Sequence, residues 1–202
     1  MQTQVMSNLE LIRDFVNTSD LESGEDKLAD TQGLQYWLVF HGLAELRDRA
    51  TEQDLLAARE IREAIRELLR GHNGFGVDLD AASATLDEAS RETGLAVRFE
   101  DGAIRLVSSD TGVAGGLGRV LAAVGAAMAD GSWRRLKACR SDTCRWAFID
   151  NARNLSRQWC DMAVCGNRAK VQRFSQRHRA LGIARQSESG SGPGSSPRFD
   201  AR

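Results

Sequence analysis

The stretch CRSDTCRWAFIDNARNLSRQWCDMAVCGNR, residues 139–168, contains all four cysteines of this 202-residue chain. They form two pairs, with four residues inside each pair and fifteen residues between the pairs. Zinc takes four thiolates in a tetrahedron, and two local pairs joined by one segment supply them at a small entropic cost of loop closure. Because no cysteine is left over, the spacing predicts one structural Zn²⁺ ion bound by Cys139, Cys144, Cys160 and Cys165.

The expected cellular compartment affects which chemistry the cysteines carry. The first twenty residues mix charges with apolar positions and lack a basic leader segment, so we predict no signal peptide. No apolar run is expected to reach transmembrane length. We therefore expect a cytoplasmic, nucleoid-associated protein, in which disulfides are rare. Buried free thiols remain an alternative to zinc, and so does a thiol-based redox sensor, because nearby arginines lower the pKa of a thiol.

Charge is unevenly distributed along the chain. Residues 1–132 hold 12 basic and 23 acidic residues, a net charge of −11, whereas residues 133–185 hold 13 and 3, a net charge of +10. Such a concentration of cations favours a polyanionic partner, for which we predict double-stranded DNA. The predicted nucleic-acid-binding residues are Arg145, Arg153, Arg157, Arg168, Lys170, Arg173 and Arg177.

The segment after Cys165 has the pattern of a helix. A step of about 100° per residue places Lys170, Arg173 and Arg177 on one arc, and no acidic residue lies between positions 161 and 188 to neutralise them. The neighbouring arc carries Phe174, with His178 and Leu181 further along, and it is predicted to pack against the rest of the finger. His178 is interpreted as a packing or surface residue rather than a zinc ligand.

The front half has helical periodicity interrupted by one hairpin signal. Thr31 is a candidate N-cap, and Thr51 with Asp54 resembles a capping box. Asp101-Gly102 lies between two alternating segments and predicts a hairpin near residues 95–108. The Gly- and Ala-rich segment that follows predicts a closely packed helix and lacks both phosphate-loop motifs. The predicted helices are residues 9–16, 31–42, 51–71, 80–93 and 112–130.

These elements define the predicted fold class, mainly α with a small β-hairpin (α+β). A helical regulatory domain, residues 1–132, precedes a small treble-clef-like zinc finger with four cysteine ligands, residues 133–185. In the finger, a turn with the first cysteine pair leads to a short hairpin, and the second pair begins the final helix. Zinc would replace a core too small to be stable alone. The Gly-, Ser- and Pro-rich tail, residues 186–202, is predicted to be disordered.

Residues 139–173, CRSDTCRWAFIDNARNLSRQWCDMAVCGNRAKVQR, resemble the CGNR zinc finger family, whose tetrapeptide stands here at residues 165–168. The segments LELIRDFVNT, residues 9–18, and LQYWLVFHGL, residues 34–43, resemble the start of the ABATE domain that precedes such fingers. The two resemblances cover residues 8–182. One departure is Ala152, where the CGNR family often has serine. The resemblance implies a bacterial transcription regulator with the finger on DNA and a stress-responsive front domain.

The role of the front domain is open at this point. It could be a sensor pocket for an unknown small-molecule effector, a homodimer interface, or an intramolecular mask for the basic finger; no membrane partner is expected. Asp14, Asn17 and Thr18 are candidate ligand-binding residues, and the alternative interpretation of Asn17 and Thr18 is helix capping.

Other functions of the finger remain open as well. An RNA-binding or protein-adaptor module could use the same scaffold, with Trp146, Phe148 and Trp159 either stacking on bases or forming a miniature core. An enzyme is disfavoured, because four thiolates leave no open position on the metal.

Overall fold

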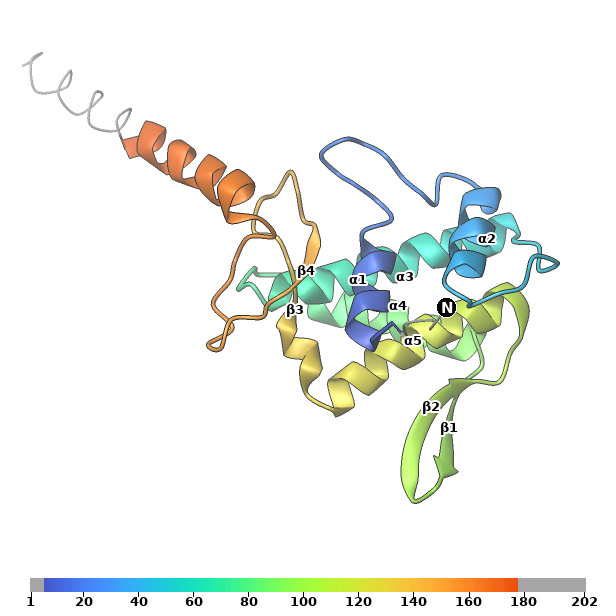
Figure 1. Cartoon of the computed structure of the whole chain (residues 1–202). Helices are drawn as coiled ribbons and strands as arrows, with labels where there is room; N and C mark the ends of the chain where they lie inside the picture. The colour runs from blue at the N-terminus through green and yellow to red at the C-terminus, as the bar shows by residue number, and fades with distance from the viewer. Residues whose placement is uncertain (1–5, 178–202) are drawn as a thin grey trace, which may run out of the picture. The chain divides into compact units, whose positions relative to one another are not determined.

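A computed structural model describes residues 6–177 (Figure 1). The chain forms two compact units, Met1–Cys160 and Asp161–Arg202. The predicted boundary between residues 132 and 133 stays a prediction. The tail predicted to be disordered lies outside the described residues, as do His178 and Leu181.

Five α-helices lie within the described part of the first unit, residues 6–160, and they confirm the predicted fold class. Two of the helices begin with a capping box, in which two residues exchange hydrogen bonds: Ser7 with Glu10 at the first helix, and the predicted pair of Thr51 with Asp54 at the third. The helices are α1 (Asn8–Val16), α2 (Thr31–Phe40), α3 (Glu52–Gly71), α4 (Leu79–Glu92) and α5 (Gly112–Ala129).

The predicted cap of α2 was wrong by one residue. Asp30, not Thr31, is the N-cap, and its carboxylate accepts a hydrogen bond of 2.7 Å from the Gly33 amide. Asp30 has the extended backbone that an N-cap requires, whereas Thr31 is already helical. A carboxylate at this end of a helix is also favoured by the helix dipole.

Helix α5 packs against the other four helices and carries much of the core. Gly118 permits its close approach, because a Cβ atom there would lie 2.8 Å from the Thr93 carbonyl oxygen. By length and composition alone, these 18 residues could cross a membrane, contrary to the sequence expectation. However, 61% of the segment is buried inside the protein, with Leu117, Val120 and Ala127 at 0–1% exposure. Its apolar character is therefore that of a central core helix.

The hairpin predicted near residues 95–108 is present as antiparallel strands β1 (Leu95–Glu100) and β2 (Ala103–Ser108). Asp101 and Gly102 join them with φ angles of 51° and 77°, the left-handed geometry of a tight two-residue hairpin turn. Strand β2 packs on α5, and the tip of the hairpin projects away from the helices (Figure 1).

A second, shorter hairpin consists of β3 (Leu136–Ala138) and β4 (Ala147–Ile149), preceded by the 3-10 turn η1 (Ser132–Arg135). The sequence predicted a short hairpin after the first cysteine pair. In the structure β3 precedes Cys139 and β4 follows Cys144, so the hairpin encloses that pair instead. Strand β3 packs on α3 and β4 packs on α1, and Leu136, Ala138 and Ala147 are almost completely buried. The hairpin that encloses the first cysteine pair therefore shares its hydrophobic core with the helices of the front half.

Candidate metal centre and nucleic-acid interface

The four cysteine sulfur atoms form one cluster. All lie within 4.8 Å of one another, and the sulfurs of Cys144 and Cys160 are 3.6 Å apart. A zinc ion with four Zn–S bonds of about 2.3 Å places its sulfurs about 3.8 Å apart, so the cluster fits a tetrahedral Zn²⁺ ion. The predicted cofactor, one structural zinc held by Cys139, Cys144, Cys160 and Cys165, is thereby confirmed. Four protein ligands fill the tetrahedron, and the ion would supply cross-linking rather than a reactive position.

Local backbone geometry positions the first cysteine pair. Residues 139–146, called the knuckle below, leave β3 and return into β4. The Cys139 amide donates to the Trp146 carbonyl at 2.9 Å, and the Cys144 amide donates to the Ser141 carbonyl at 3.0 Å. Arg145 closes the turn in the left-handed region, with φ 49°. The knuckle thus brings the sulfurs of Cys139 and Cys144 into one cluster.

The last ligand lies in the second unit, in the π-helical turn η2 (Met162–Gly166). Asp161 caps this turn, because its carboxylate accepts a hydrogen bond of 2.9 Å from the Val164 amide. The chain continues as a helix over residues 167–177. A metal-bound turn therefore leads directly into the cationic helix, as the sequence predicted.

The proximity of the thiols perturbs their acidity. Hydrogen bonds from Cys144 and Cys160 lower the pKa of Cys139 to about 2. The same contacts with Cys139 raise the pKa of Cys144 to about 12 and also raise the pKa of Cys160. Closely packed thiols favour one thiolate and oppose further ones, and a divalent cation removes this mutual repulsion.

A buried ion pair organises the loop between the two cysteine pairs. Lys137 Nζ lies 2.9 Å from Asp150 Oδ2, and the two residues are 5% and 0% exposed. The Lys137 ammonium also donates to the carbonyls of Leu155 and Arg157. Sequence reasoning missed Lys137, although it is one of only three lysines in an arginine-rich chain.

The Asp150 carboxylate also contacts the main chain of this loop. It accepts hydrogen bonds from the backbone amides of Ala152 and Arg157, at 2.9 and 3.0 Å. Burial by itself raises the pKa of Asp150, but the Lys137 hydrogen bond and these amides lower it, and the net change is downward. Ala152 thus contributes its main-chain amide to the loop.

Polar side chains of the front helices hold the β3–β4 hairpin. Asn17, the C-cap of α1, donates to the Ala147 carbonyl at 2.9 Å and accepts from the Ala147 amide at 2.8 Å. Asn73 donates to the carbonyls of Ala138 and Gln158, at 2.6 and 3.1 Å. No sequence pattern indicated Asn73. Because Asn17 satisfies both backbone groups of a β4 residue, it acts as a side-chain substitute for a neighbouring strand.

The three residues predicted to bind a small molecule, Asp14, Asn17 and Thr18, have different surroundings. Thr18 is 1% exposed, and its hydroxyl donates to the Phe15 carbonyl at 2.8 Å, which is a capping contact. Asp14 is half-buried and forms an ion pair of 2.8 Å with Arg13. Asp14 and Asn17 line a common cavity, whereas Thr18 is not among its lining residues.

Replacing Asn17 by alanine should destabilise the protein by about 2 kcal/mol, because it leaves a buried amide and a buried carbonyl of Ala147 without partners. Urea unfolding of the zinc-loaded protein, followed by circular dichroism, would measure this. Asn8→Ala, at the exposed start of α1, is the matched control and should change stability by less than about 0.5 kcal/mol. Equal effects of the two substitutions would show that the Asn17 contact contributes nothing.

The predicted nucleic-acid-binding residues differ in exposure. In the first unit, Arg153 and Arg157 are exposed, whereas Arg145 is half-buried. The Arg157 guanidinium lies 5.2 Å from the centre of the Phe148 ring and donates to the Cys160 carbonyl. The Arg145 Nε atom is buried without a hydrogen-bond partner in the structure. Arg153 and Arg157 are therefore more accessible than Arg145.

In the second unit, all four predicted cations are exposed. The Nε atoms of Arg173 and Arg177 contact backbone carbonyls of Ala169 and Arg173 on their own helix, at 3.3 and 3.5 Å. The neighbouring arc that was predicted to pack is exposed too, with Val171 at 64% and Phe174 at 60%. Up to residue 177, this helix presents both its charges and its apolar side chains to solvent. The exposed cations are Arg168, Lys170, Arg173 and Arg177.

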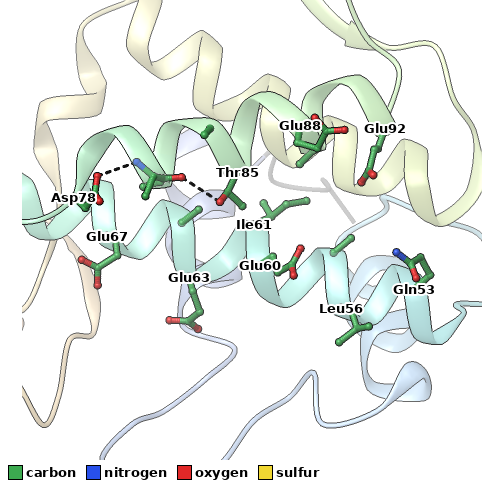
Figure 2. Close-up of a pocket in the computed structure, with 16 residues that line it drawn as sticks. Gln53, Leu56, Glu60, Ile61, Glu63, Glu67, Asp78, Thr85, Glu88 and Glu92 are labelled. Atoms are coloured by element: carbon green, nitrogen blue, oxygen red, sulfur yellow. Dashed lines mark hydrogen bonds between the residues drawn. The ribbon is translucent and has the colours of Figure 1, made fainter.

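A groove of about 840 Å³ between α3 and α4 has the opposite charge (Figure 2). Six alanines are among its lining residues, and carboxylates project along its rim. Such a rim repels phosphate, so this face is excluded as a nucleic-acid contact. Part of the acidic charge of the front half is thus concentrated in one groove. The sequence did not indicate this, because the acidic residues are scattered along it. The acidic residues of the rim are Glu60, Glu63, Glu67, Asp78, Glu88 and Glu92.

Comparison with known protein families agrees with these features. The CGNR zinc finger model matches residues 135–178. The ABATE model, described as "Putative stress-induced transcription regulator", matches residues 9–131, which is more than half of the chain. No curated protein matched the chain. With its regulator-type front half and its four-cysteine metal centre, the chain belongs to the ABATE family and carries a CGNR zinc finger.

Proposed function

We propose that this protein is a zinc-dependent, DNA-binding transcription regulator of the bacterial cytoplasm, not an enzyme. The finger contacts double-stranded DNA, and the ABATE domain regulates that contact. The observation that carries the proposal is the exposed row of Lys170, Arg173 and Arg177 on a helix that begins at the metal-bound turn. The description of the ABATE family supports regulation of transcription as the output.

Electrostatics supports a polyanionic partner for the finger. With four thiolates and one Zn²⁺, the charge of residues 133–185 falls from +10 to about +8. The Lys137–Asp150 pair is internally neutral and buried, so it contributes nothing to this net charge. Arginine guanidinium groups bind phosphate in a bidentate manner, and they also recognise guanine edges in the major groove.

The test is sequencing of genomic DNA fragments that the zinc-loaded protein retains at physiological salt. A sequence-specific regulator enriches one motif, and the Cys165→Ser protein should lose that enrichment. Uniform retention of all fragments, or none, would contradict the proposal. The DNA need not be known in advance, because the enriched motif identifies the binding site.

The double substitution Arg173→Ala/Arg177→Ala should weaken DNA binding and reduce the slope of log K against log salt concentration by about 2. Each phosphate contact contributes about 0.9 to that slope. Fluorescence anisotropy with the enriched fragment at several salt concentrations measures both quantities. Arg98→Ala/Arg105→Ala, on the exposed hairpin, removes the same charge and should leave the slope unchanged. Equal losses of DNA affinity and slope in both double variants would show that the finger helix is not the contact surface.

An RNA-binding or protein-adaptor function is the second candidate, and the exposed Val171 and Phe174 beside the cations favour it. Aromatic side chains next to arginines are typical of surfaces that stack on unpaired bases. Competition between duplex DNA and single-stranded RNA separates the candidates. A regulator retains the duplex, whereas an RNA reader releases it.

A further inference from the structure

A cavity of about 650 Å³ in the first unit lies between α1 and α2 and reaches the knuckle. Its volume is in the range of small-molecule sites, which are mainly aromatic and apolar with a few polar groups. Tyr36, Trp37 and Phe40 come from α2, His41 follows them directly, and Trp146 comes from the knuckle. Five aromatic rings from two distant segments thus line one space.

The rings favour a flat ligand. Tyr36 and Phe40 are 6.3 Å apart with an interplanar angle of 24°, and Trp37 and His41 are 4.2 Å apart. Trp37 is 5% exposed and forms part of the protein core, whereas Tyr36 and Phe40 are 73% and 72% exposed. Two large exposed aromatic side chains beside a cavity provide an open apolar face on which a planar ring system can stack.

The charged groups on the cavity wall determine whether an anionic or a cationic ligand is favoured. Arg13 and Asp14 neutralise each other in their 2.8 Å ion pair. Lys27 is exposed, and its ammonium has no ion-pair partner within residues 6–177. Burial lowers the pKa of His41, Asp14 raises it and Lys27 lowers it, with a downward net change, so His41 adds no charge at neutral pH. The cavity therefore carries one uncompensated positive charge.

The cavity also touches the groups that hold the knuckle. Asn17 lines it and forms both hydrogen bonds to the Ala147 backbone. Trp146 lines it as well, and its carbonyl accepts the hydrogen bond from the Cys139 amide. A molecule in this cavity contacts residues that are one hydrogen bond away from a zinc ligand and from β4.

We propose that this cavity binds a planar aromatic monocarboxylate, and that Asn17 and Trp146 transmit its occupancy to the zinc knuckle. The rings stack on the ligand and Lys27 pairs with its carboxylate. Control of DNA binding by this ligand rests on the proposed function, whereas ligand binding and its effect on zinc do not.

Binding is tested by calorimetry of the full-length, zinc-loaded protein with 1-naphthoate as the probe. The cationic isostere 1-naphthylmethylammonium should bind at least about tenfold more weakly than 1-naphthoate, since it places a positive charge beside Lys27. Phe40→Ala and Lys27→Gln should each weaken naphthoate binding about fivefold. Because both side chains are exposed, both variants are expected to fold.

Matched controls are Phe99→Ala and Arg98→Gln, an exposed aromatic residue and an exposed cation on the β1–β2 hairpin. Both should bind naphthoate like the unmodified protein. Absence of naphthoate binding, equal binding of the two probes, or equal losses in the variants and their controls would overturn the proposal.

Transmission to the knuckle is tested by the rate at which an excess of a chromogenic chelator removes zinc. Saturating naphthoate should change that rate at least about threefold in the unmodified protein. At the same concentration it should change the rate less in Phe40→Ala. An unchanged rate in the fully liganded protein would overturn the transmission. Neither experiment contains DNA, so a failure of the proposed DNA binding is distinguishable from a failure here.

Discussion

Cys165→Ser is expected to lose its zinc and its DNA binding while the five helices of the first unit remain folded. The serine hydroxyl is a poor ligand, and the three remaining cysteines leave the tetrahedron open. Structural zinc sites of this kind contribute about 10–16 kcal/mol of binding free energy, so the loss of one ligand has a large effect. Zinc content by mass spectrometry should fall from one equivalent toward zero, and DNA affinity should fall to the nonspecific level.

The structure refines where disorder should appear in this variant. Strands β3 and β4 keep their contacts to α1 and α3, including those of Asn17 and Asn73, because these contacts do not involve the metal. The order of the chain from Asp161 onward depends on Cys165, which lies in η2. Amide hydrogen exchange should therefore increase after residue 160 and stay low in the five helices.

Val164→Ser is the matched control, since it introduces the same side chain one position earlier in the same turn, where Val164 is 44% exposed. It should keep one equivalent of zinc. If Cys165→Ser retained stoichiometric zinc and full DNA affinity, the metal centre would not be the basis of the proposed function.

Local signals in the sequence were sufficient for much of this fold. The helices follow from apolar periodicity, and the first hairpin follows from Asp101-Gly102, because these features depend on neighbouring residues. The zinc ligands follow from the spacing of the cysteines. The error at Thr31 is also local, because it shifts the N-cap by one residue. Asp30 and Thr31 are both residue types that cap helices, and the extended backbone of Asp30 decides between them.

Features that depend on distant residues were not predictable in this way. Asn17 and Ala147 are 130 positions apart, and only the packing of β4 on α1 brings them together. The sequence presents Asn17 as a ligand residue or a cap, yet its main contact is with the zinc-finger hairpin. To predict the Lys137–Asp150 ion pair, one would have to know that both side chains are buried beside the same loop. Counting charges along the chain does not show this.

The second large effect is expected for Lys137→Met, which should destabilise the zinc-loaded protein by about 3–5 kcal/mol. Methionine approximates the length of the lysine side chain but leaves the fully buried Asp150 carboxylate without its cation. Removing one partner of a buried ion pair is costly because the remaining charge is neither solvated nor paired. Urea unfolding at neutral pH, with zinc present throughout, measures the change in the free energy of unfolding.

Lys170→Met is the matched control, because it removes the same charge from an accessible position and should cost less than about 0.5 kcal/mol. The double substitution Lys137→Met/Asp150→Asn separates the charge from the shape of the pair. Asparagine is neutral and can still accept from the Ala152 or Arg157 amide, so the double variant should recover about 1–2 kcal/mol relative to Lys137→Met. A cost below about 1 kcal/mol for Lys137→Met, or no recovery in the double variant, would mean that the loop between the cysteine pairs does not depend on this ion pair.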